Sequence, residues 1–249
     1  MKLTGNTILI TGGGTGIGKA LAKQFCKLGN EVIICGRREY RLKEVQDECP
    51  GIHIKRCDIN SADDRKELFE YVKKEFPQLN VLINNGAVQT DYDLKLGLDG
   101  LEYAEEEISI ILNAPIMLNG AFIPFLMNQQ DPIIVNVTSM LGLTPLTRIP
   151  IYCAAKAGFH VYSLELRKHL EDTPIKVFEV PPPRVETELN PEGRKNAKPG
   201  TEKIGLEADE YAAFVIEKMG QDVLDIFYPP WGDMIQTRPR YETELSRLL

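Results

Sequence analysis

Short runs of Ile and Val that do not alternate with polar residues recur along this chain, separated by longer segments with apolar residues at helical spacing. The expected strands are residues 6–11, 31–36, 51–58, 80–85, 132–139, 175–181 and 224–228. The expected helices are residues 16–29, 38–48, 61–76, 100–128, 150–172 and 207–220. Strands that are apolar on both faces are typical of a parallel sheet. The pattern therefore predicts a Rossmann-type, doubly wound α/β fold with helices on both faces of a mostly parallel sheet.

Composition narrows the class of protein. The 249 residues suit a single domain, and we expect residues 1–249 to form one. A net charge of −7 disfavours a nucleic-acid partner. The five cysteines are odd in number and lack CxxC spacing, which predicts reduced thiols and not a disulfide frame or a zinc site. The first residues lack the apolar stretch of a signal peptide, so we expect a cytoplasmic protein.

The stretch 108–130 contains no charged residue and is long enough to span a bilayer. It also contains Asn113, Asn119, two prolines and a glycine, which a lipid-exposed helix disfavours. We therefore expect no membrane span here. We interpret the stretch as a helix that is covered by protein on most sides, including a subunit interface.

A glycine-rich turn, TGGGTGIG at residues 11–18, lies between the first expected strand and the first expected helix. Gly12, Gly16 and Gly18 allow a tight turn and a close approach of the backbone to a bulky anion. The free N–H groups at the start of the helix suit a diphosphate. No Lys-Ser or Lys-Thr follows, so the turn is not a P-loop. The alternative is a glycine-rich turn that binds nothing.

A second pattern carries chemistry, because Tyr152 precedes Lys156 by four residues and both lie on one face of a helix. A free tyrosine titrates near pH ~10 and is a poor proton donor at neutral pH. A nearby ammonium group favours the phenolate and lowers the pKa of the tyrosine. The pair therefore predicts a proton donor for carbonyl reduction. The alternative is an exposed helix that carries Tyr and Lys by accident.

These patterns together resemble the short-chain dehydrogenases/reductases. The shared motifs are T-G-x-x-x-G-x-G, the Asn-Asn pair at 84–85, a serine after the fifth strand and Y-x-x-x-K, in the usual order over about residues 5–190. The resemblance implies transfer of a hydride between nicotinamide and a small-molecule carbonyl or alcohol. The catalytic residues that it implies are Asn113, Ser139, Tyr152 and Lys156. Asn119 is an alternative to Asn113, and Ser139 has the alternative role of satisfying backbone groups at the strand end.

The resemblance also implies a set of residues that hold the cofactor. They are Gly12, Thr15, Gly16, Ile17, Gly18, Arg37, Arg38, Asp58, Ile59, Asn84, Gly86, Tyr152, Lys156, Val185 and Thr187. NAD-dependent relatives usually place an acidic side chain where this chain has Gly36. Arg37 follows and is suited to grip a 2′-phosphate. We therefore predict NADP(H) as the preferred cofactor, with NAD(H) possible. The alternative is that both arginines are solvated cations at a helix start.

Two motifs depart from the family pattern. Residues 84–87 read NNGA where Asn-Asn-Ala-Gly is usual, and 181–187 read PPPRVET, which places Pro183 where a glycine is expected. Proline removes an N–H group and restricts φ, so this turn must tolerate both. The polar segment 188–205 is interpreted as a lid over the substrate, with a plain solvent loop as the alternative.

Three expectations remain. The histidines at 53, 160 and 169 have no evident partners, so we treat them as structural and assign no metal. The family resemblance implies a homodimer or homotetramer formed by the two long helices. The rival functional hypothesis is a non-catalytic NADP(H)-binding sensor or assembly module, which the altered turns favour and the complete set of Asn, Ser, Tyr and Lys positions disfavours.

Overall fold

A six-stranded sheet forms the centre of the protein in a computed structural model that describes residues 1–190 and 205–229. Every pair in the sheet is parallel, and the strand order is β3-β2-β1-β4-β5-β6. The strands are β1 Thr7–Thr11, β2 Glu31–Gly36, β3 Ile52–Arg56, β4 Val81–Asn84, β5 Ile133–Val137 and β6 Lys176–Val180. The order reverses between β1 and β4, so the carboxyl ends of these strands border the crevice where ligands bind in such sheets.

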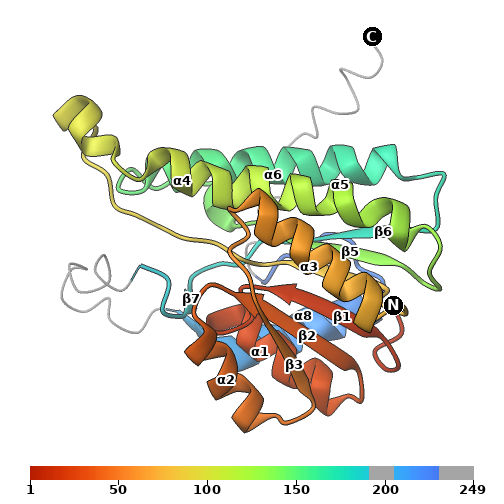
Figure 1. Cartoon of the computed structure of the whole chain (residues 1–249). Helices are drawn as coiled ribbons and strands as arrows, with labels where there is room; N and C mark the ends of the chain where they lie inside the picture. The colour runs from red at the N-terminus through yellow and green to blue at the C-terminus, as the bar shows by residue number, and fades with distance from the viewer. Residues whose placement is uncertain (191–204, 230–249) are drawn as a thin grey trace, which may run out of the picture.

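Helices cover both faces of the sheet (Figure 1). On one face lie α1 Gly16–Lys27, α2 Glu39–Glu48 and α8 Ala208–Gly220. The other face carries α3 Ala62–Glu75, α4 Ala104–Ile108, α5 Ala114–Leu126 and α6 Pro150–His169. A short parallel pair, β7 Val185–Glu186 and β8 Leu206–Glu207, lies outside the main sheet. The predicted doubly wound α/β fold is confirmed.

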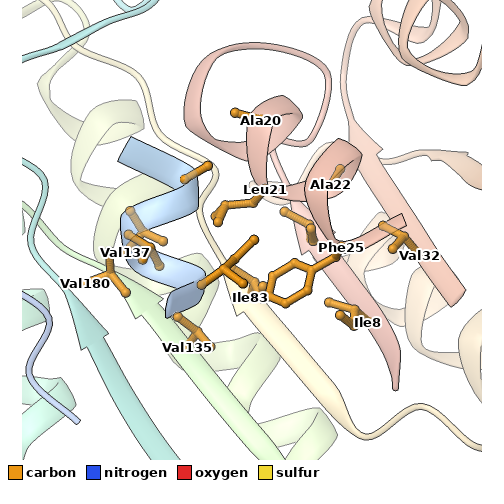
Figure 2. Packing of buried hydrophobic residues seen from close by; sticks show 14 of the residues in the cluster. Ile8, Ala20, Leu21, Ala22, Phe25, Val32, Ile83, Val135, Val137 and Val180 are labelled. Atoms are coloured by element: carbon orange, nitrogen blue, oxygen red, sulfur yellow. The ribbon is translucent and has the colours of Figure 1, made fainter. Parts of the chain in front are cut away.

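The strands are buried on both faces, as their non-alternating composition predicts. Ile8 and Ile10 of β1 pack in one cluster with Leu21 and Phe25 of α1. Leu9 points to the opposite face, into the cluster that contains residues of α3, α5 and α6. Figure 2 shows the first cluster, in which Leu21 and Phe25 lie against Ile8 and other sheet residues. Burial of both faces explains why every position of β1 is apolar or a buried threonine.

The expected helix at 100–128 is interrupted. Residues Leu94–Leu101 form 3-10 turns with a kink at Gly97, and the α-helix starts only at Ala104. A π-helical turn, Ser109–Asn113, separates α4 from α5. By length and composition the helix Ala104–Leu126 would suffice to cross a membrane. Leu118, Phe122 and Leu126 are almost fully buried against the sheet, so one face of this helix belongs to the core. Only 39% of the apolar window is buried, so the expectation that protein covers it on most sides is wrong for this chain by itself.

The expected strand at 224–228 does not form. One bridge between Asp225 and Glu179 extends the sheet beyond β6. The Glu179 N–H donates to the carbonyl of Leu224, and the Ile226 N–H donates to the carbonyl of Glu179. The Phe227 N–H then donates back to the carbonyl of Asp225 at 3.3 Å. This local turn redirects the backbone and ends the pairing after a single residue.

Candidate active site

The glycine turn brings three segments into contact. Gly12 and Gly16 have φ values of 66° and 55°, where side chains are disfavoured. A Cβ atom on Gly12 would lie 2.8 Å from the Cα of Gly86, and one on Gly16 would lie 2.9 Å from the Cγ2 of Thr187. A Cβ atom on Gly18 would lie 2.4 Å from the carbonyl oxygen of Gly12. The turn therefore packs closely against the ends of β4 and β7, and any side chain at these positions would force them apart.

The start of α1 is suited to bind an anion. Thr15 precedes the helix in an extended conformation, and in the part of the chain that the structure describes its side chain accepts no hydrogen bond from the helix. The first turn also contains no acidic residue. N–H groups without intrahelical partners, together with the helix dipole, attract phosphate groups. The predicted role of Gly16, Ile17 and Gly18 in holding a diphosphate stays a prediction that this geometry supports.

Thr11 and Asn85 connect this turn to β4. Both lie in motifs that the sequence singled out, but neither was among the residues predicted to hold the cofactor. The Thr11 hydroxyl accepts hydrogen bonds of 3.0 Å from the N–H groups of Asn85 and Gly86. The Asn85 side chain donates to the carbonyl oxygens of Thr11 at 3.0 Å and Gly12 at 3.2 Å. The second asparagine of the pair at 84–85 was the available signal. These bonds hold the glycine turn in its position above the sheet.

Asn84 belongs to a buried polar network. Its amide donates to the side-chain oxygens of Asn119 at 2.8 Å and Asn136 at 3.0 Å. Asn119 in turn donates to the hydroxyl of Tyr162 at 3.3 Å. The network joins β4, α5, β5 and α6. Asn119, which the sequence left as an alternative to Asn113, therefore lies among structural partners.

Asn113 lies elsewhere. It is the last residue of the π-helical turn and is exposed. Two residues earlier in the same turn, Ile111 is buried against Tyr152 and Ala155 of α6. The structure thus brings the backbone of this turn against the helix that carries Tyr152. The catalytic role of the Asn113 side chain stays a prediction.

Ser139, Tyr152 and Lys156 come together at the carboxyl end of β5, and all three are buried. The side chains of Tyr152 and Ser139 interact. The Ser139 hydroxyl also accepts a hydrogen bond of 3.1 Å from the N–H of Leu141, so it has the local structural role as well. The Lys156 ammonium donates to the carbonyl of Val137 at 2.7 Å.

Burial dominates the electrostatics of this group. It raises the pKa of Tyr152 to about 12, although the interaction with Ser139 lowers it. Burial also lowers the pKa of Lys156 to about 7, while the negative charge of Glu179 raises it. The expectation that the ammonium lowers the pKa of Tyr152 does not hold in this structure, because desolvation disfavours the charged form of both groups.

The two arginines after β2 differ in position. The guanidinium of Arg37 pairs with the carboxylate of Glu106 at 3.0 Å. The guanidinium of Arg38 lies 3.5 Å from the hydroxyl of Thr15, beside the glycine turn. Both side chains are about half exposed. Arg38 is therefore the arginine that the structure places next to the diphosphate-type site.

The segment after β6 reaches the same region. Val185 pairs with β8 and is buried, and Thr187 contacts the glycine turn as described above. The carboxylate of Glu188 lies 3.0 Å from Arg41 and 3.7 Å from Arg38. Sequence reasoning missed Arg41, which lies one helical turn after Arg37. Most of the expected lid, residues 191–204, falls outside the described residues, so the lid remains a prediction.

The remaining predicted positions also lie at strand ends. The Asp58 carboxylate accepts a hydrogen bond of 3.0 Å from the N–H of Asn60 and so shapes the turn after β3. Ile59 is buried, and its Cδ1 would lie 2.8 Å from a Cβ atom on Gly86. In the proline turn, the Pro182 carbonyl accepts from the N–H of Met140 at 3.0 Å. The altered turn is thereby tied to the end of β5.

The expectation that the histidines lack partners is wrong for two of them. The Nδ1 of His160 lies 2.8 and 2.9 Å from the two carboxylate oxygens of Glu179. The Nε2 of His53 lies 3.6 Å from the carboxylate of Glu31. Glu179 is only 1% exposed. Lys176 is exposed at the start of β6, but Glu179 lies among the buried residues of this strand. This charge was the signal for a buried partner, because an unpaired charge is costly inside a protein.

Comparison with known proteins agrees with this arrangement. The sequence model of the family described as short chain dehydrogenase matches residues 6–198. The oxidoreductase DltE of Bacillus subtilis (strain 168) is 44% identical over 226 residues, which are 91% of this chain and 89% of that protein. The NADP-dependent 3-hydroxy acid dehydrogenase of Schizosaccharomyces pombe is 30% identical over 197 residues, 76% of this chain and 75% of that protein.

Solved structures share the fold. A short chain dehydrogenase/reductase from Burkholderia phymatum in complex with NAD has a TM-score of 0.84 and 20% identity, covering 99% of this chain and 96% of that one. A short chain dehydrogenase from Burkholderia cenocepacia in complex with NADP has a TM-score of 0.81 and 19% identity, and the match covers 100% of this chain and 99% of that one. This chain therefore belongs to the short chain dehydrogenases and is an oxidoreductase that acts with a nicotinamide cofactor.

Proposed function

We propose that the protein is an NADP(H)-dependent oxidoreductase that moves a hydride between nicotinamide and a small carbonyl or alcohol substrate. One observation carries the proposal. Tyr152 and Ser139 interact in a buried position, with Lys156 one helical turn away, at the same edge of the sheet as the glycine turn. A phenol, a hydroxyl and an amine at this edge support the proposed reaction, because a sheet of this order binds its ligand there.

Each side chain has a defined task in reduction. A nicotinamide dinucleotide held at the glycine turn would supply the hydride for the carbonyl carbon. The Ser139 hydroxyl donates a hydrogen bond to the carbonyl oxygen and polarises it, and the Tyr152 hydroxyl delivers the proton to that oxygen. The raised pKa keeps Tyr152 protonated at neutral pH but makes it a weaker acid than free tyrosine, so proton transfer depends on the hydrogen bond with Ser139 and on the charge of Lys156. Lys156 stabilises the phenolate that remains, and Asn113 supports the relay that returns a proton.

The preference for NADP(H) is supported by charge. Gly36 leaves no carboxylate at the end of β2, and Arg38 and Arg41 lie beside the glycine turn, where a 2′-phosphate needs cations. The relative from Schizosaccharomyces pombe is named as NADP-dependent, whereas one structural neighbour contains NAD and the other NADP. NAD(H) is therefore the expected weaker cofactor.

Assembly and location complete the proposal. Ile108, Met117 and Val161 on α4, α5 and α6 have 41%, 50% and 57% of their surface exposed. These apolar side chains support a homodimer or homotetramer formed through the long helices. Sedimentation velocity at micromolar concentration tests this, and a monomer would contradict it. All five cysteines are free, which supports a cytoplasmic location.

A substrate panel tests the reaction. NADPH oxidation is followed by absorbance with aldehydes, ketones and 3-oxo acids, in parallel with NADH. We expect a higher kcat/KM with NADPH. Tyr152→Phe removes the proton donor and should lower kcat at least ~100-fold while NADPH still binds with similar affinity in calorimetry.

The matched control is Tyr162→Phe, because Tyr162 lies on the same helix and its hydroxyl accepts a hydrogen bond from Asn119, away from Ser139 and Lys156. It should retain turnover. Full activity of Tyr152→Phe would refute the role of Tyr152. Tight NADPH binding without turnover of any carbonyl would instead support the sensor hypothesis.

A further inference from the structure

A buried carboxylate lies behind the candidate catalytic residues. Glu179 of β6 is 1% exposed, and both of its oxygens are within 2.9 Å of the Nδ1 of His160. One oxygen also accepts a hydrogen bond of 2.6 Å from the hydroxyl of Thr138. A buried carboxylate is costly without compensation, so this environment must supply positive charge as well as hydrogen bonds.

Helix α6 carries the basic side chains near this carboxylate. Tyr152, Lys156 and His160 follow one another at intervals of four residues and therefore share one face of the helix. Lys156 is 2% exposed, and Glu179 is the charge that raises its pKa against the lowering effect of burial. Glu179 therefore lies near enough to Lys156 to act on its charge, and His160 contacts Glu179 from the next turn of the helix.

The end of β5 contacts Glu179 as well as the candidate catalytic residues Tyr152 and Lys156. Three consecutive residues take part: Val137 accepts the hydrogen bond of the Lys156 ammonium, Thr138 donates to Glu179, and Ser139 interacts with Tyr152. Glu179 therefore contacts the strand that supplies the acceptor of Lys156. Moving or neutralising this carboxylate would change both the charge near Lys156 and the strand end that holds it.

We propose that Glu179 is a positioning residue that favours the charged form of Lys156 and holds this side chain against Val137, with His160 sharing the carboxylate. The importance of this role for turnover rests on the function proposed above. Other charged groups nearby are engaged elsewhere. Arg167 of α6 and Asp225 beside β6 pair with each other at 2.6 Å. Glu107 of α4 acts on Tyr152.

The first measurement follows Lys156 directly and does not need a substrate. Lysine labelled with ¹³C at Cε is observed by NMR across pH 5–11, and the Lys156 signal is assigned by its loss in Lys156→Arg. Glu179→Gln retains the size and hydrogen bonds of the side chain but removes its charge. We expect the titration midpoint of Lys156 to fall by roughly one pH unit or more, because an opposite charge nearby is lost.

Two further variants separate charge from loosened structure. Glu165→Gln removes an exposed carboxylate from the same helix and should leave the midpoint unchanged. His160→Gln removes the histidine that shares the Glu179 carboxylate with Lys156, so the titration midpoint of Lys156 should stay the same or rise. This variant keeps the test decisive if Glu179→Gln fails to fold. An unchanged midpoint in Glu179→Gln, or a fall in His160→Gln, overturns the proposal.

Activity provides a second readout. For NADPH-linked reduction, the alkaline limb of the kcat/KM profile should move to lower pH in Glu179→Gln and stay in place in Glu165→Gln. A shifted NMR midpoint with no turnover in the native protein would support the role of Glu179 and refute the proposed reaction. If both proteins turn over substrate and Glu179→Gln has the same pH profile and the same Lys156 midpoint as native protein, the proposed reaction is supported and the role of Glu179 is refuted.

Discussion

The Nζ atom of Lys156 lies 5.8 Å from the centroid of the Tyr152 ring and donates a hydrogen bond of 2.7 Å to the carbonyl of Val137. The two residues are one helical turn apart and both are buried. Burial has opposite effects on their pKa values, because it disfavours the phenolate in one case and the ammonium in the other. The tyrosine therefore keeps its proton strongly, while the lysine holds its proton weakly.

This relationship predicts a pH-dependent stability. The pKa of Lys156 is about 7 in the folded protein and 10.5 ordinarily, so the unfolded chain binds more protons between these values. Stability from this group is lost as the pH falls towards 7 and gained as it rises towards 10.5. The free energy of unfolding of Lys156→Met, relative to that of the native protein, should therefore be higher at pH 6 than at pH 9 by on the order of 2 kcal/mol. Urea unfolding at both pH values measures this.

The control for this prediction is Lys168→Met. Lys168 lies on the same helix, and 73% of its side chain is exposed. Its effect on the free energy of unfolding should be the same at pH 6 and pH 9. An equal response of the two variants to pH would show that Lys156 is not desolvated as described.

The close approach of the glycine turn predicts a strong effect of a single methyl group. A Cβ atom on Gly18 would meet the Gly12 carbonyl at 2.4 Å and the Asn85 amide at 2.5 Å. Gly18→Ala should lower the free energy of unfolding by about 1–3 kcal/mol and weaken dinucleotide binding. Gly120→Ala is the control, because nothing lies within 4 Å of its Cβ position and alanine favours the helix. Equal unfolding midpoints for the two variants would contradict the packing.

Thr11 offers a separate test of the same turn. Thr11→Val removes the acceptor of two N–H groups, those of Asn85 and Gly86. Unsatisfied buried donors should lower the free energy of unfolding by about 1–3 kcal/mol. Thr7→Val, on the same strand, removes only a hydroxyl that donates to Glu31 at 3.3 Å and should have a smaller effect. Denaturant unfolding compares the two, and a larger loss in Thr7→Val would refute the role of Thr11.

From the position of Arg38 beside the glycine turn we predict that this residue distinguishes NADPH from NADH in binding. Arg38→Ala should weaken NADPH binding roughly tenfold and leave NADH binding nearly unchanged, because only NADPH carries the 2′-phosphate. Lys43→Ala is the control, since Lys43 is an exposed cation on α2, the helix that Arg38 precedes, and is paired with Glu39. Calorimetry with both dinucleotides measures the change. A parallel loss of NADPH and NADH affinity in Arg38→Ala would mean that Arg38 supports the turn and does not select the phosphate.

The order of elements, the parallel sheet and the positions of the glycine turn, Ser139, Tyr152 and Lys156 were predictable from local patterns. Buried strands and amphipathic helices have distinct periodicities, and side chains four residues apart share a helix face. The strand expected at 224–228 was wrong because a backbone hydrogen bond from Phe227 to Asp225 ends the pairing, and composition does not reveal such a bond.

What the tertiary structure decided is which distant groups meet and how they influence one another. Glu179 lies beside His160 and Lys156 only because β6 pairs with β5 beneath α6. The pKa of Tyr152 rises, contrary to the expectation from its spacing to Lys156. The spacing of two residues predicts that their side chains are close, but it does not predict how far burial removes them from water. Desolvation and long-range pairing depend on the packed chain as a whole, so no local sequence pattern contains them.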